Sequence, residues 1–329
     1  MVLRDVGLES PIGERVFEGS GQTAAGTSQA WESRSQCSLC GSLPSHWAVF
    51  ESRPSGEGLL TYVLCRVCGL VFMDPKPTEP ALTEFYAANY RVQVQGQEGP
   101  TSKDRWAQKR RASHLLDLAR PAIPKVARHL DIGCSLGELL DAFRDRYQCE
   151  SLGIEPGEAY RELGRRRGLN VFPGLESLPA EFRSRIDLIS LAHVLEHLPE
   201  PVEFLRRVRR DWMVPGGHLI VEVPNLLCHP SLEPSHLTAF HAQSLRWTIE
   251  AAGFRAVRIK THGRPHSRLL PLFVTVLAQA AGTGDFAERA GSPVRGLRLR
   301  RRLGVSLLRN ARGLSRLLLG RRQLRPWEP

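Results

Sequence analysis

From about residue 126 the chain alternates short apolar segments with amphipathic ones, and this alternation restricts the fold more than any other feature. Apolar segments that end in glycine, proline or a polar residue are typical of strands, and among them are VARHLDIG, ESLGIEP, LNVFPG, RIDLISLAHV and GGHLIVEVPN. The intervening segments, such as ELLDAFRDRY and EPVEFLRRVRRDW, have the spacing of helices. Strands that alternate with helices predict a doubly wound α/β fold, in which a parallel sheet is covered on both faces.

The first of these strands ends in a glycine-rich segment, LDIGCSLGELL, which contains Asp131, Gly133 and Gly137. Gly133 lets the backbone turn sharply, and Gly137 leaves space where a ligand can press against the loop. Glu155 ends the next strand, where an acid can accept hydrogen bonds from ribose hydroxyls. A tight turn and an exposed acid are the plainer interpretation, but the position of Glu155 favours a nucleoside site.

This combination of loop and acid suits either NAD or S-adenosylmethionine. The loop lacks the G-x-G-x-x-G fingerprint and therefore offers less to a pyrophosphate. S-adenosylmethionine has no phosphate and carries a positively charged sulfonium, so the sequence favours this cofactor over a dinucleotide.

The chain resembles the class I S-adenosylmethionine-dependent methyltransferases over roughly residues 105–280. The segments that carry the resemblance, in the family's order, are LDIGCSLG, GIEPG, IDLISLAHVLEHLPEP, VPGGHLIVEVPN and SLRWTIEAAGF. It is most similar to the group whose fourth strand runs into an H-V-L-E-H turn, whose members act on small molecules, quinone precursors and sugars. The resemblance implies a Rossmann-like, mostly parallel sheet of seven strands.

The resemblance also assigns cofactor contacts to individual residues. In this family the glycine loop holds the methionine part of the cofactor and the acid after the second strand holds the ribose, which correspond here to Asp131, Gly133, Gly137 and Glu155. An acid after the third strand often contacts the adenine amine, and Glu176 stands near that place in FPGLESLPAEF.

The segment HVLEH has two chemical interpretations. Its H-x-x-E-H pattern matches the inverted zinc-peptidase motif, in which helical spacing puts His193, Glu196 and His197 on one face. However, it follows a strand directly, and Pro199 and Pro201 stop any long helix. We therefore expect a new helix to begin here, with His193 and His197 lining the cofactor and acceptor cleft. A structural turn in which Glu196 caps a helix is the alternative.

A second group of histidines, His229, His236 and His241, lies in PNLLCHPSLEPSHLTAFHAQSL. This segment follows the fifth strand, at the edge of the sheet where substrates enter. A neutral imidazole is suited to accept a proton from an acceptor hydroxyl near pH 7. We expect His236 first and His193 second to have this role, whereas His229 and His241 can equally be structural.

Four of the seven cysteines form a C-x2-C-x24-C-x2-C pattern, and these are Cys37, Cys40, Cys65 and Cys68. Four thiolates suit tetrahedral zinc, and a closed site leaves no position for substrate, so we predict a structural zinc ribbon. A redox pair is the alternative. The segment LCRVCGLVFMDPKP resembles the ribbon that precedes some bacterial methyltransferases of glycan and sugar pathways. Packing roles are expected for the other three, Cys134, Cys149 and Cys228.

The net charge of +11 is concentrated near the C-terminus, because residues 292–329 hold eleven arginines and one acid. Helical spacing predicts an apolar face of Leu303, Leu307, Leu314, Leu317 and Leu318 opposite an arginine face of Arg302, Arg309, Arg312 and Arg316. Such a helix can lie on an anionic membrane or dock on the catalytic domain, or the segment can be a disordered tail. Aromatic residues are scarce there, so we do not expect nucleic acid as a partner.

These features divide the chain into a flexible leader (1–33), a zinc ribbon (34–80), a helical linker or lid (81–125), a cofactor-binding domain (126–285) and an arginine-rich amphipathic tail (286–329). We expect a cytoplasmic protein that can contact the inner membrane face through residues 295–325. The expected function is methyl transfer to a sugar, glycan or other small molecule, free or lipid-linked, with O-methylation favoured over C-methylation. The alternatives are a non-catalytic cofactor-binding scaffold and, more remotely, the zinc peptidase.

Overall fold

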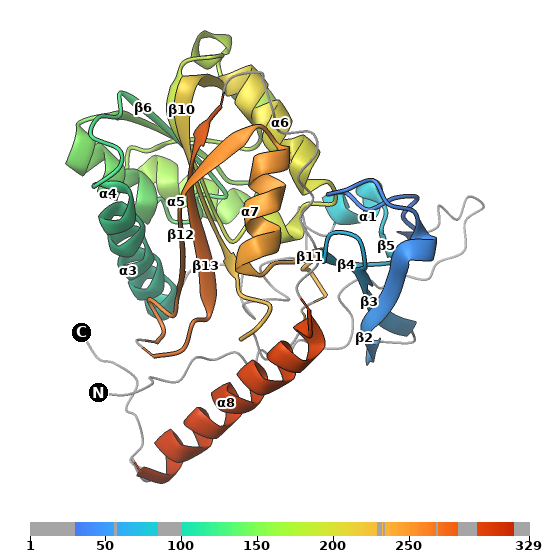
Figure 1. Cartoon of the computed structure of the whole chain (residues 1–329). Coiled ribbons are helices and arrows are strands. Elements are labelled where there is room, and N and C mark those ends of the chain that lie inside the picture. Colours follow the sequence, from blue (N-terminus) through green and yellow to red (C-terminus); the bar gives the residue numbers. More distant parts are fainter. Residues whose placement is uncertain are drawn as a thin grey trace, which may run out of the picture.

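The computed structural model of the chain describes residues 30–55, 58–84, 101–228, 232, 234–267, 269–281 and 295–318. In this part of the chain a large sheet flanked by helices stands beside a small sheet, and a long helix, α8 (Leu297–Leu318), runs next to both (Figure 1). Residues 1–29 of the predicted leader lie outside the described residues.

The large sheet has seven strands in the order β12-β13-β10-β9-β6-β7-β8. These strands are β6 (Arg128–Ile132), β7 (Glu150–Ile154), β8 (Asn170–Phe172), β9 (Ile186–Ala192), β10 (Met213–Pro224), β12 (Phe254–His262) and β13 (Phe273–Ala280). The pairs from β8 to β10 are parallel, and β13 is antiparallel to both of its neighbours. The mostly parallel seven-stranded sheet is therefore confirmed.

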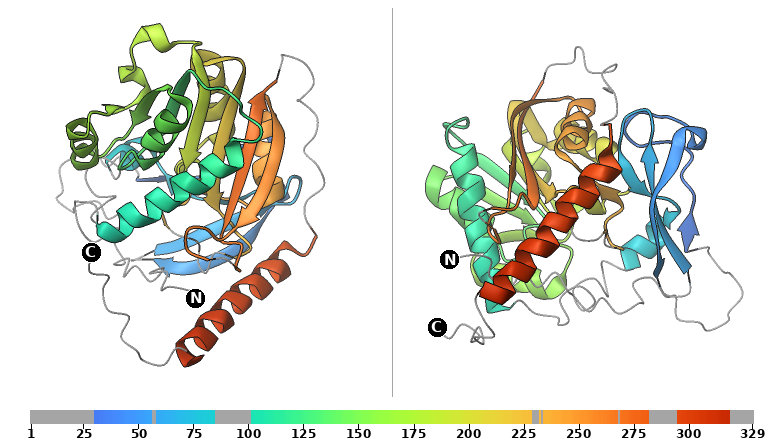
Figure 2. Two further views of the ribbon diagram at one scale, coloured as in Figure 1. Left: turned by 90° about the vertical axis from the view of Figure 1, so that its left-hand side faces the viewer. Right: turned by 60° about the horizontal axis from the view of Figure 1, so that its bottom comes forward.

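Helices cover both faces of this sheet (Figure 2). They are α3 (Ser102–Ala119), α4 (Glu138–Tyr147), α5 (Glu158–Arg166), α6 (Pro201–Trp212) and α7 (Ala242–Ala251). On one face, Leu115 of α3 and Phe143 of α4 share a core with strand residues. On the other, Leu205 of α6 and Leu245 of α7 belong to a second core. Their apolar residues recur at helical spacing, so each helix buries one stripe against the sheet.

The cysteine pairs lie beside the small sheet, whose strand order is β11-β4-β3-β2. Its elements, with those beside it, are β1 (Trp31–Glu32), β2 (Trp47–Ser55), β3 (Gly58–Cys65), β4 (Val71–Met73), β5 (Lys76–Pro77), α1 (Glu79–Glu84) and β11 (Thr238–Ala239). Because β1 pairs with β5, the ordered module begins slightly before the boundary at residue 34.

The small sheet and the large domain share one core. Strand β11 comes from the second histidine segment, yet it pairs with β4 of the cysteine module. Cys65 and Phe72 of the module pack in the same apolar cluster as Phe240 and Leu245. The module is therefore packed against the large domain and is not a separate domain on a linker.

The C-terminal helix α8 (Leu297–Leu318) is docked through its first turns. Leu297, Val305 and Leu308 are buried, and a Cβ on Gly304 would lie 2.1 Å from the carbonyl oxygen of Leu227. Over these turns the structure agrees with one of the alternatives for the tail, a helix that docks on the rest of the protein. None of the helices in the described part of the chain combines the length and hydrophobicity needed to cross a bilayer.

Candidate active site and metal centre

The loop between β6 and α4 makes the sharp turn that its glycines predict. Gly133 and Gly137 have φ of 77° and 75°, in the left-handed region that favours glycine. A Cβ on Gly133 would lie 2.4 Å from Val194 Cγ2, and one on Gly137 would lie 2.2 Å from Leu169 Cδ1. The absence of a side chain at Gly137 therefore makes room for Leu169. We had expected it to make room for a ligand that presses against the loop.

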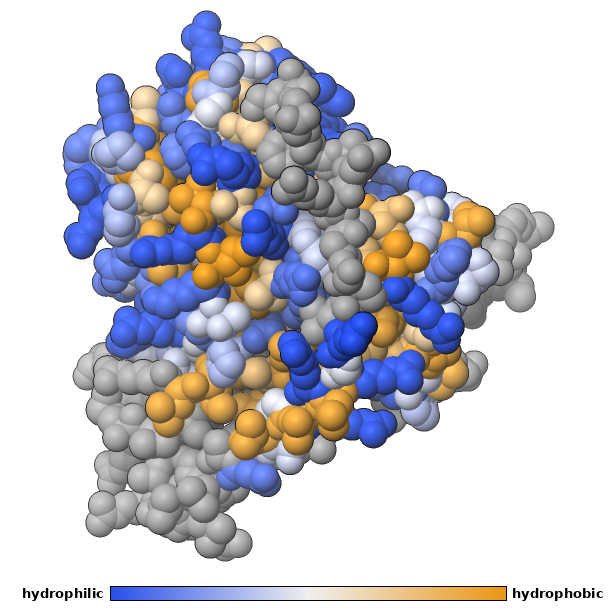
Figure 3. Space-filling view, viewed as in Figure 1, coloured by the Kyte–Doolittle hydropathy of each residue, from blue (hydrophilic) through white to orange (hydrophobic). Residues whose placement is uncertain are grey.

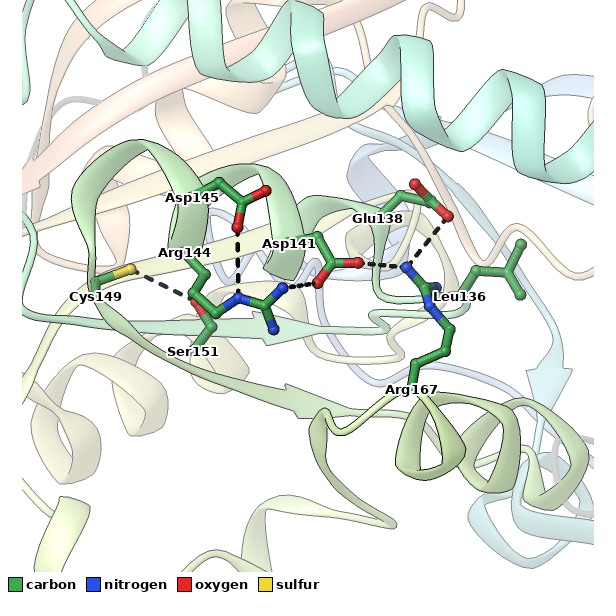
Figure 4. Close-up of polar contacts among 8 residues, drawn as sticks. All are labelled: Leu136, Glu138, Asp141, Arg144, Asp145, Cys149, Ser151 and Arg167. Carbon is green, nitrogen blue, oxygen red and sulfur yellow. Dashed lines mark hydrogen bonds and ion pairs between the residues drawn. The ribbon is translucent and has the colours of Figure 1, made fainter.

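An arginine ties the end of this loop to the next helix. Arg167, just after α5, donates to the carbonyl oxygen of Leu136 and to Asp141 of α4 (Figure 4). Its Nη2 also lies 3.5 Å from Glu138 Oε1, and Arg144 donates to Asp141 over 2.6 Å. These contacts hold the first turn of α4 and the loop before it in one arrangement.

Asp131, one of the predicted cofactor residues, lies in a buried polar chain across β6 and β9. Ser190 donates to Asp131 Oδ1 over 2.6 Å, and His129 Nε2 lies 2.8 Å from the Ser190 oxygen. Burial raises the pKa of Asp131 to about 7, although the Ser190 hydroxyl favours the charged form. Burial lowers the pKa of His129 to about 3, so this imidazole is neutral.

Glu155 follows β7 and faces the glycine loop. It is 3% exposed, and its carboxylate accepts hydrogen bonds from the backbone N–H of Ser135 (3.0 Å) and Gly157 (2.9 Å). A carboxylate has about four accepting positions, so it can receive further donors such as ribose hydroxyls. Glu176 is exposed in a short turn after β8, at the same edge of the sheet, and its contact with adenine stays a prediction.

The HVLEH segment does not form the helix that we predicted. His193 is left-handed, with φ of 59°, and only Leu195–His197 make one 3-10 turn. The His193 N–H donates to the carbonyl oxygen of Glu222, which keeps the chain on the sheet edge, and α6 begins only at Pro201. The helical face that an H-x-x-E-H peptidase requires is therefore absent from this segment.

The same segment instead brings histidines around a buried carboxylate. Glu196 is 1% exposed, and among the described residues neither of its oxygens has a well-formed hydrogen bond. His193 Nδ1 lies 3.3 Å and His197 Nε2 lies 4.0 Å from Glu196 Oε1. Burial opposes ionisation, but His193, His197 and His236 outweigh it and lower the pKa of Glu196. The cluster therefore contains an ionised carboxylate.

His236 completes this cluster from the second histidine segment. Its ring centroid lies 4.9 Å from that of His197, and ligand atoms of Glu196, His197 and His236 lie within 4.8 Å of one another, close enough to bind one metal ion. The Ser235 carbonyl accepts from His197 Nδ1 over 2.8 Å, which leaves Nε2 facing Glu196. The three predicted catalytic histidines are thus brought together.

The other two histidines of that segment differ from His236. His241 is buried at the start of α7, where Ser244 N–H donates to its Nδ1 over 3.5 Å, and burial lowers the pKa of His241 to about 4. This is a structural role. His229 lies outside the described residues. Cys134, Cys149 and Cys228 are buried, as expected for packing residues.

A second buried carboxylate, Glu222 of β10, adjoins His193. Arg111 Nε donates to Glu222 over 2.7 Å, and His193 Nε2 and His262 Nε2 lie 3.4 and 3.3 Å from its oxygens. Burial and Arg111 disfavour a charged His193, but Glu196 and Glu222 outweigh them and raise its pKa. His193 therefore carries its proton more readily than an ordinary histidine.

Sequence reasoning did not identify Glu222 or Arg111 as site residues. Glu222 had a usable signal, because it is the lone acid within the apolar strand LIVEVP, and a buried acid in a strand needs a partner. Arg111 lies in α3 among other charged residues, and nothing in its surroundings distinguishes it from a surface arginine.

The four paired cysteines converge on one point. Cys37 Sγ lies 3.6 Å from Cys68 Sγ, Cys40 Sγ lies 3.6 Å from Cys65 Sγ, and all four sulfurs lie within 4.8 Å of one another. Tetrahedral zinc with Zn–S bonds of about 2.3 Å separates its sulfurs by roughly 3.8 Å, so this donor set fits zinc. Left-handed Gly41 and Gly69 close the two knuckles, as they donate to the carbonyl oxygens of Cys37 and Cys65.

A doubly wound sheet with one antiparallel strand, in which a glycine loop follows the first strand and an acid the second, is characteristic of class I S-adenosylmethionine-dependent methyltransferases. The described part of the chain has this arrangement. In agreement, residues 104–259 match the family model described as "Methyltransferase domain".

Two curated relatives have related sequences. A trans-aconitate 2-methyltransferase of Rhizobium leguminosarum bv. trifolii is 28% identical over 162 residues, which are 46% of this chain and 60% of the relative. A ubiquinone biosynthesis O-methyltransferase of Proteus mirabilis is 28% identical over 103 residues, 29% of this chain and 41% of the relative. The chain thus spans less than two thirds of either protein.

Solved structures resemble the same region. One is the 1,6-didemethyltoxoflavin-N1-methyltransferase of Burkholderia thailandensis with bound 1,6-didemethyltoxoflavin and S-adenosylhomocysteine. It is 18% identical, the match covers 67% of this chain and 96% of that one, and the TM-score is 0.48.

Proposed function

We propose that this protein transfers a methyl group from S-adenosylmethionine to a small-molecule acceptor, with a sugar or glycan hydroxyl as the favoured acceptor. The observation that supports the proposal is that the glycine loop, Glu155 and the buried histidine cluster all lie at the carboxyl ends of neighbouring strands. That edge is where ligands bind in doubly wound sheets. The resemblance of the cysteine module to those of sugar-modifying enzymes supports the acceptor class.

The cofactor-binding residues in this proposal are Asp131, Gly133, Gly137 and Glu155, with Glu176 and His193 at the rim. When bound, S-adenosylmethionine supplies a methyl group activated by a sulfonium. The Glu155 carboxylate lies beside the glycine loop, where it can accept hydrogen bonds from ribose hydroxyls, and burial excludes water from the adjoining Asp131. Orientation and water exclusion are the main contributions of such a site.

On the acceptor side, His236 accepts the hydroxyl proton. The ionised carboxylate of Glu196 stabilises the imidazolium that results, because opposite charges favour the protonated form. His193 keeps its own proton, with Nδ1 toward Glu196 and Nε2 toward Glu222, and so holds these two carboxylates in position beside His236. His197 is oriented by the Ser235 carbonyl. Oxygen as the methylated atom is favoured since this arrangement serves a nucleophile that must lose a proton.

The alternative is a cofactor-binding scaffold without catalysis. It would bind S-adenosylhomocysteine and methylate no acceptor. Buried carboxylates without well-formed hydrogen bonds are costly and cluster at functional sites, so Glu196 favours an enzyme over a scaffold.

Calorimetric titration with S-adenosylhomocysteine tests the proposal. The wild type should bind, and Glu155→Ala should weaken binding by about tenfold or more, since a charged hydrogen-bond partner is worth roughly 1.5–3 kcal/mol. Glu158→Ala is the matched control, because this acid three residues later is 78% exposed and pairs with Arg161. A folded wild type that binds no S-adenosylhomocysteine would refute the methyltransferase assignment.

A further inference from the structure

Helix α8 presents a stripe of exposed leucines on the side away from its docked face. Leu299, Leu303 and Leu307 are 61%, 58% and 64% exposed, and they recur every four residues. Hydrophobic side chains gather over α8 in the space-filling view (Figure 3). The three leucines lie over successive turns in the first half of α8. Exposed apolar stripes of this kind mark interaction surfaces.

The flanks of this leucine stripe are basic. Exposed Arg300 and Arg302 lie on either side of it at 100° per residue, and residues 292–329 contain eleven arginines but one acid. The rest of the chain is close to neutral. Positive charge that borders an apolar stripe on one helix is complementary to an apolar layer beneath negative headgroups.

The docked face fixes the orientation of the stripe. Arg301 is 6% exposed, donates to the Leu226 carbonyl over 2.7 Å and pairs with Glu51 of β2. Gly304 lies against the Leu227 carbonyl. Because these contacts use the opposite side of the helix, the leucine stripe faces outward without any need for α8 to detach.

The neighbouring loop adds to this surface and connects it with the active site. Leu269, between β12 and β13, is 78% exposed, and Leu270 and Leu272 of that loop pack with Leu308 of α8. Phe273 belongs to the same cluster, and its ring centroid lies 5.1 Å from that of His193. Any surface that binds the leucine stripe of α8 would therefore lie next to the candidate acceptor site.

We propose that the leucine stripe of α8, with its flanking arginines, lies on the surface of an anionic phospholipid bilayer. Docking on a second copy is less favoured, since two stripes facing each other would bring arginine rows together. The proposal does not depend on the proposed function. Its extension, an amphiphilic acceptor reached from the bilayer, does rest on that function.

Vesicle co-sedimentation of the full chain tests the proposal. We expect binding to phosphatidylcholine vesicles that contain about one third phosphatidylglycerol, little binding to phosphatidylcholine alone, and weakening by salt. The triple variant Leu299→Ser, Leu303→Ser, Leu307→Ser should lose at least about tenfold in affinity, because it removes buried apolar area. The pair Arg300→Gln, Arg302→Gln should reduce the preference for phosphatidylglycerol.

The matched control is Leu43→Ser with Leu59→Ser, which removes leucines that are 61% and 62% exposed in the cysteine module. This control should bind vesicles like the wild type. A wild type that does not bind anionic vesicles, or a triple variant that binds as well as the wild type, would overturn the proposal. So would a wild-type dimer in gel filtration that the triple variant converts to a monomer. Titration of every variant with S-adenosylhomocysteine distinguishes a loss of vesicle binding from a loss of cofactor binding.

Discussion

At the scale of single residues, two buried carboxyl groups at adjacent strand ends have different surroundings. Glu155 accepts hydrogen bonds from two backbone N–H groups beside the glycine loop. Asp131 is hydrogen-bonded to the Ser190 hydroxyl, and burial raises its pKa to about 7. Of the two acids, Asp131 is therefore held near the point of protonation at neutral pH.

The raised pKa of Asp131 predicts a specific pH dependence of stability. Between the ordinary pKa of 3.8 and the folded value of about 7, the folded state binds more protons than the unfolded state. This group therefore makes the free energy of unfolding fall with rising pH, by up to about 1.4 kcal/mol per pH unit, and the effect ends above pH 7. Asp131→Asn should remove that slope.

Urea unfolding of the ligand-free protein from about pH 5 to pH 8 measures this slope. The asparagine variant should gain stability relative to the wild type as the pH rises. Curves for the two proteins that stay parallel across this range would show that Asp131 titrates as an ordinary acid.

His236 and His241 belong to one segment but should respond differently to substitution. His236→Ala should lower kcat by about 10²–10⁴, because it removes the proton acceptor, and free imidazole should restore part of the rate. His241→Ala should lower the free energy of unfolding by about 1 kcal/mol through loss of a helix cap and leave kcat nearly unchanged. Rates are measured with an acceptor that the wild type methylates. Equal rate losses in both variants would argue against a catalytic His236.

At the scale of elements, packing and backbone conformation together determine why the loop before α4 requires glycine at position 137. Gly137 and Gly168 have φ of 75° and 77°, but a Cβ on Gly137 would lie 2.2 Å from Leu169 Cδ1, whereas one on Gly168 would meet nothing within 4 Å. Gly168→Ala should cost about 1–2 kcal/mol of unfolding free energy from the left-handed backbone alone. Gly137→Ala should cost more, roughly 2–4 kcal/mol, since Leu169 must also move.

Leu169→Ala provides the internal check for this pair. In the Gly137→Ala background it should recover part of the excess destabilisation, as judged by urea unfolding, because it removes the colliding methyl group. If Gly137→Ala and Gly168→Ala destabilise equally, contact with Leu169 contributes nothing to the requirement for glycine.

Most elements of the large sheet could be predicted because their signals are local. Strand β9 and helix α6 each carry a complete apolar pattern, and glycines mark the turns before α4 and after α5. The prediction of a helix at HVLEH was wrong because of a contact with a residue distant in the sequence. The His193 N–H is held by the carbonyl oxygen of Glu222, so the chain follows the sheet edge for another residue before it can turn.

The site was predictable in part for the same reason. Its cofactor residues follow from the glycine loop and from Glu155, which are both close to recognisable strand ends. The grouping of Glu196 with His236 depends on the path of a segment forty residues further along the chain, and the pairing of Glu222 with Arg111 depends on how α3 lies across the sheet. No local pattern encodes either contact.

At the scale of the whole molecule, the cysteine module and the histidine cluster form one continuous structure. Tyr62 of β3 donates to the His236 carbonyl over 2.6 Å, and the Met73 N–H donates to the Leu237 carbonyl over 2.9 Å. Strand β11 then pairs with β4. Cys65 ends β3 and Cys68 lies just before β4, so a metal ion bound by the four cysteines would hold the strands on which the His236 segment rests.

This continuity predicts that the metal centre and His236 are coupled. Tyr62→Phe removes the hydrogen bond to the His236 carbonyl oxygen and should lower the free energy of unfolding by only about 0.5–1.5 kcal/mol. It should nevertheless lower kcat by about tenfold, because this hydrogen bond holds the His236 backbone in position. Affinity for S-adenosylhomocysteine should not change, since Glu155 is held by the backbone of Ser135 and Gly157, which lie outside the module. Removing zinc with a chelator should have the same signature.

Tyr147→Phe is the matched control for Tyr62→Phe, because Tyr147 also donates to a backbone carbonyl, that of Ile123, but under α3 and away from the histidines. The free energy of unfolding should fall by a similar amount in both variants, but kcat should fall only in Tyr62→Phe. Free imidazole should not restore it, because the His236 side chain is present but displaced. If zinc removal weakens S-adenosylhomocysteine binding as much as it lowers the rate, the module supports the whole domain and has no particular effect on His236.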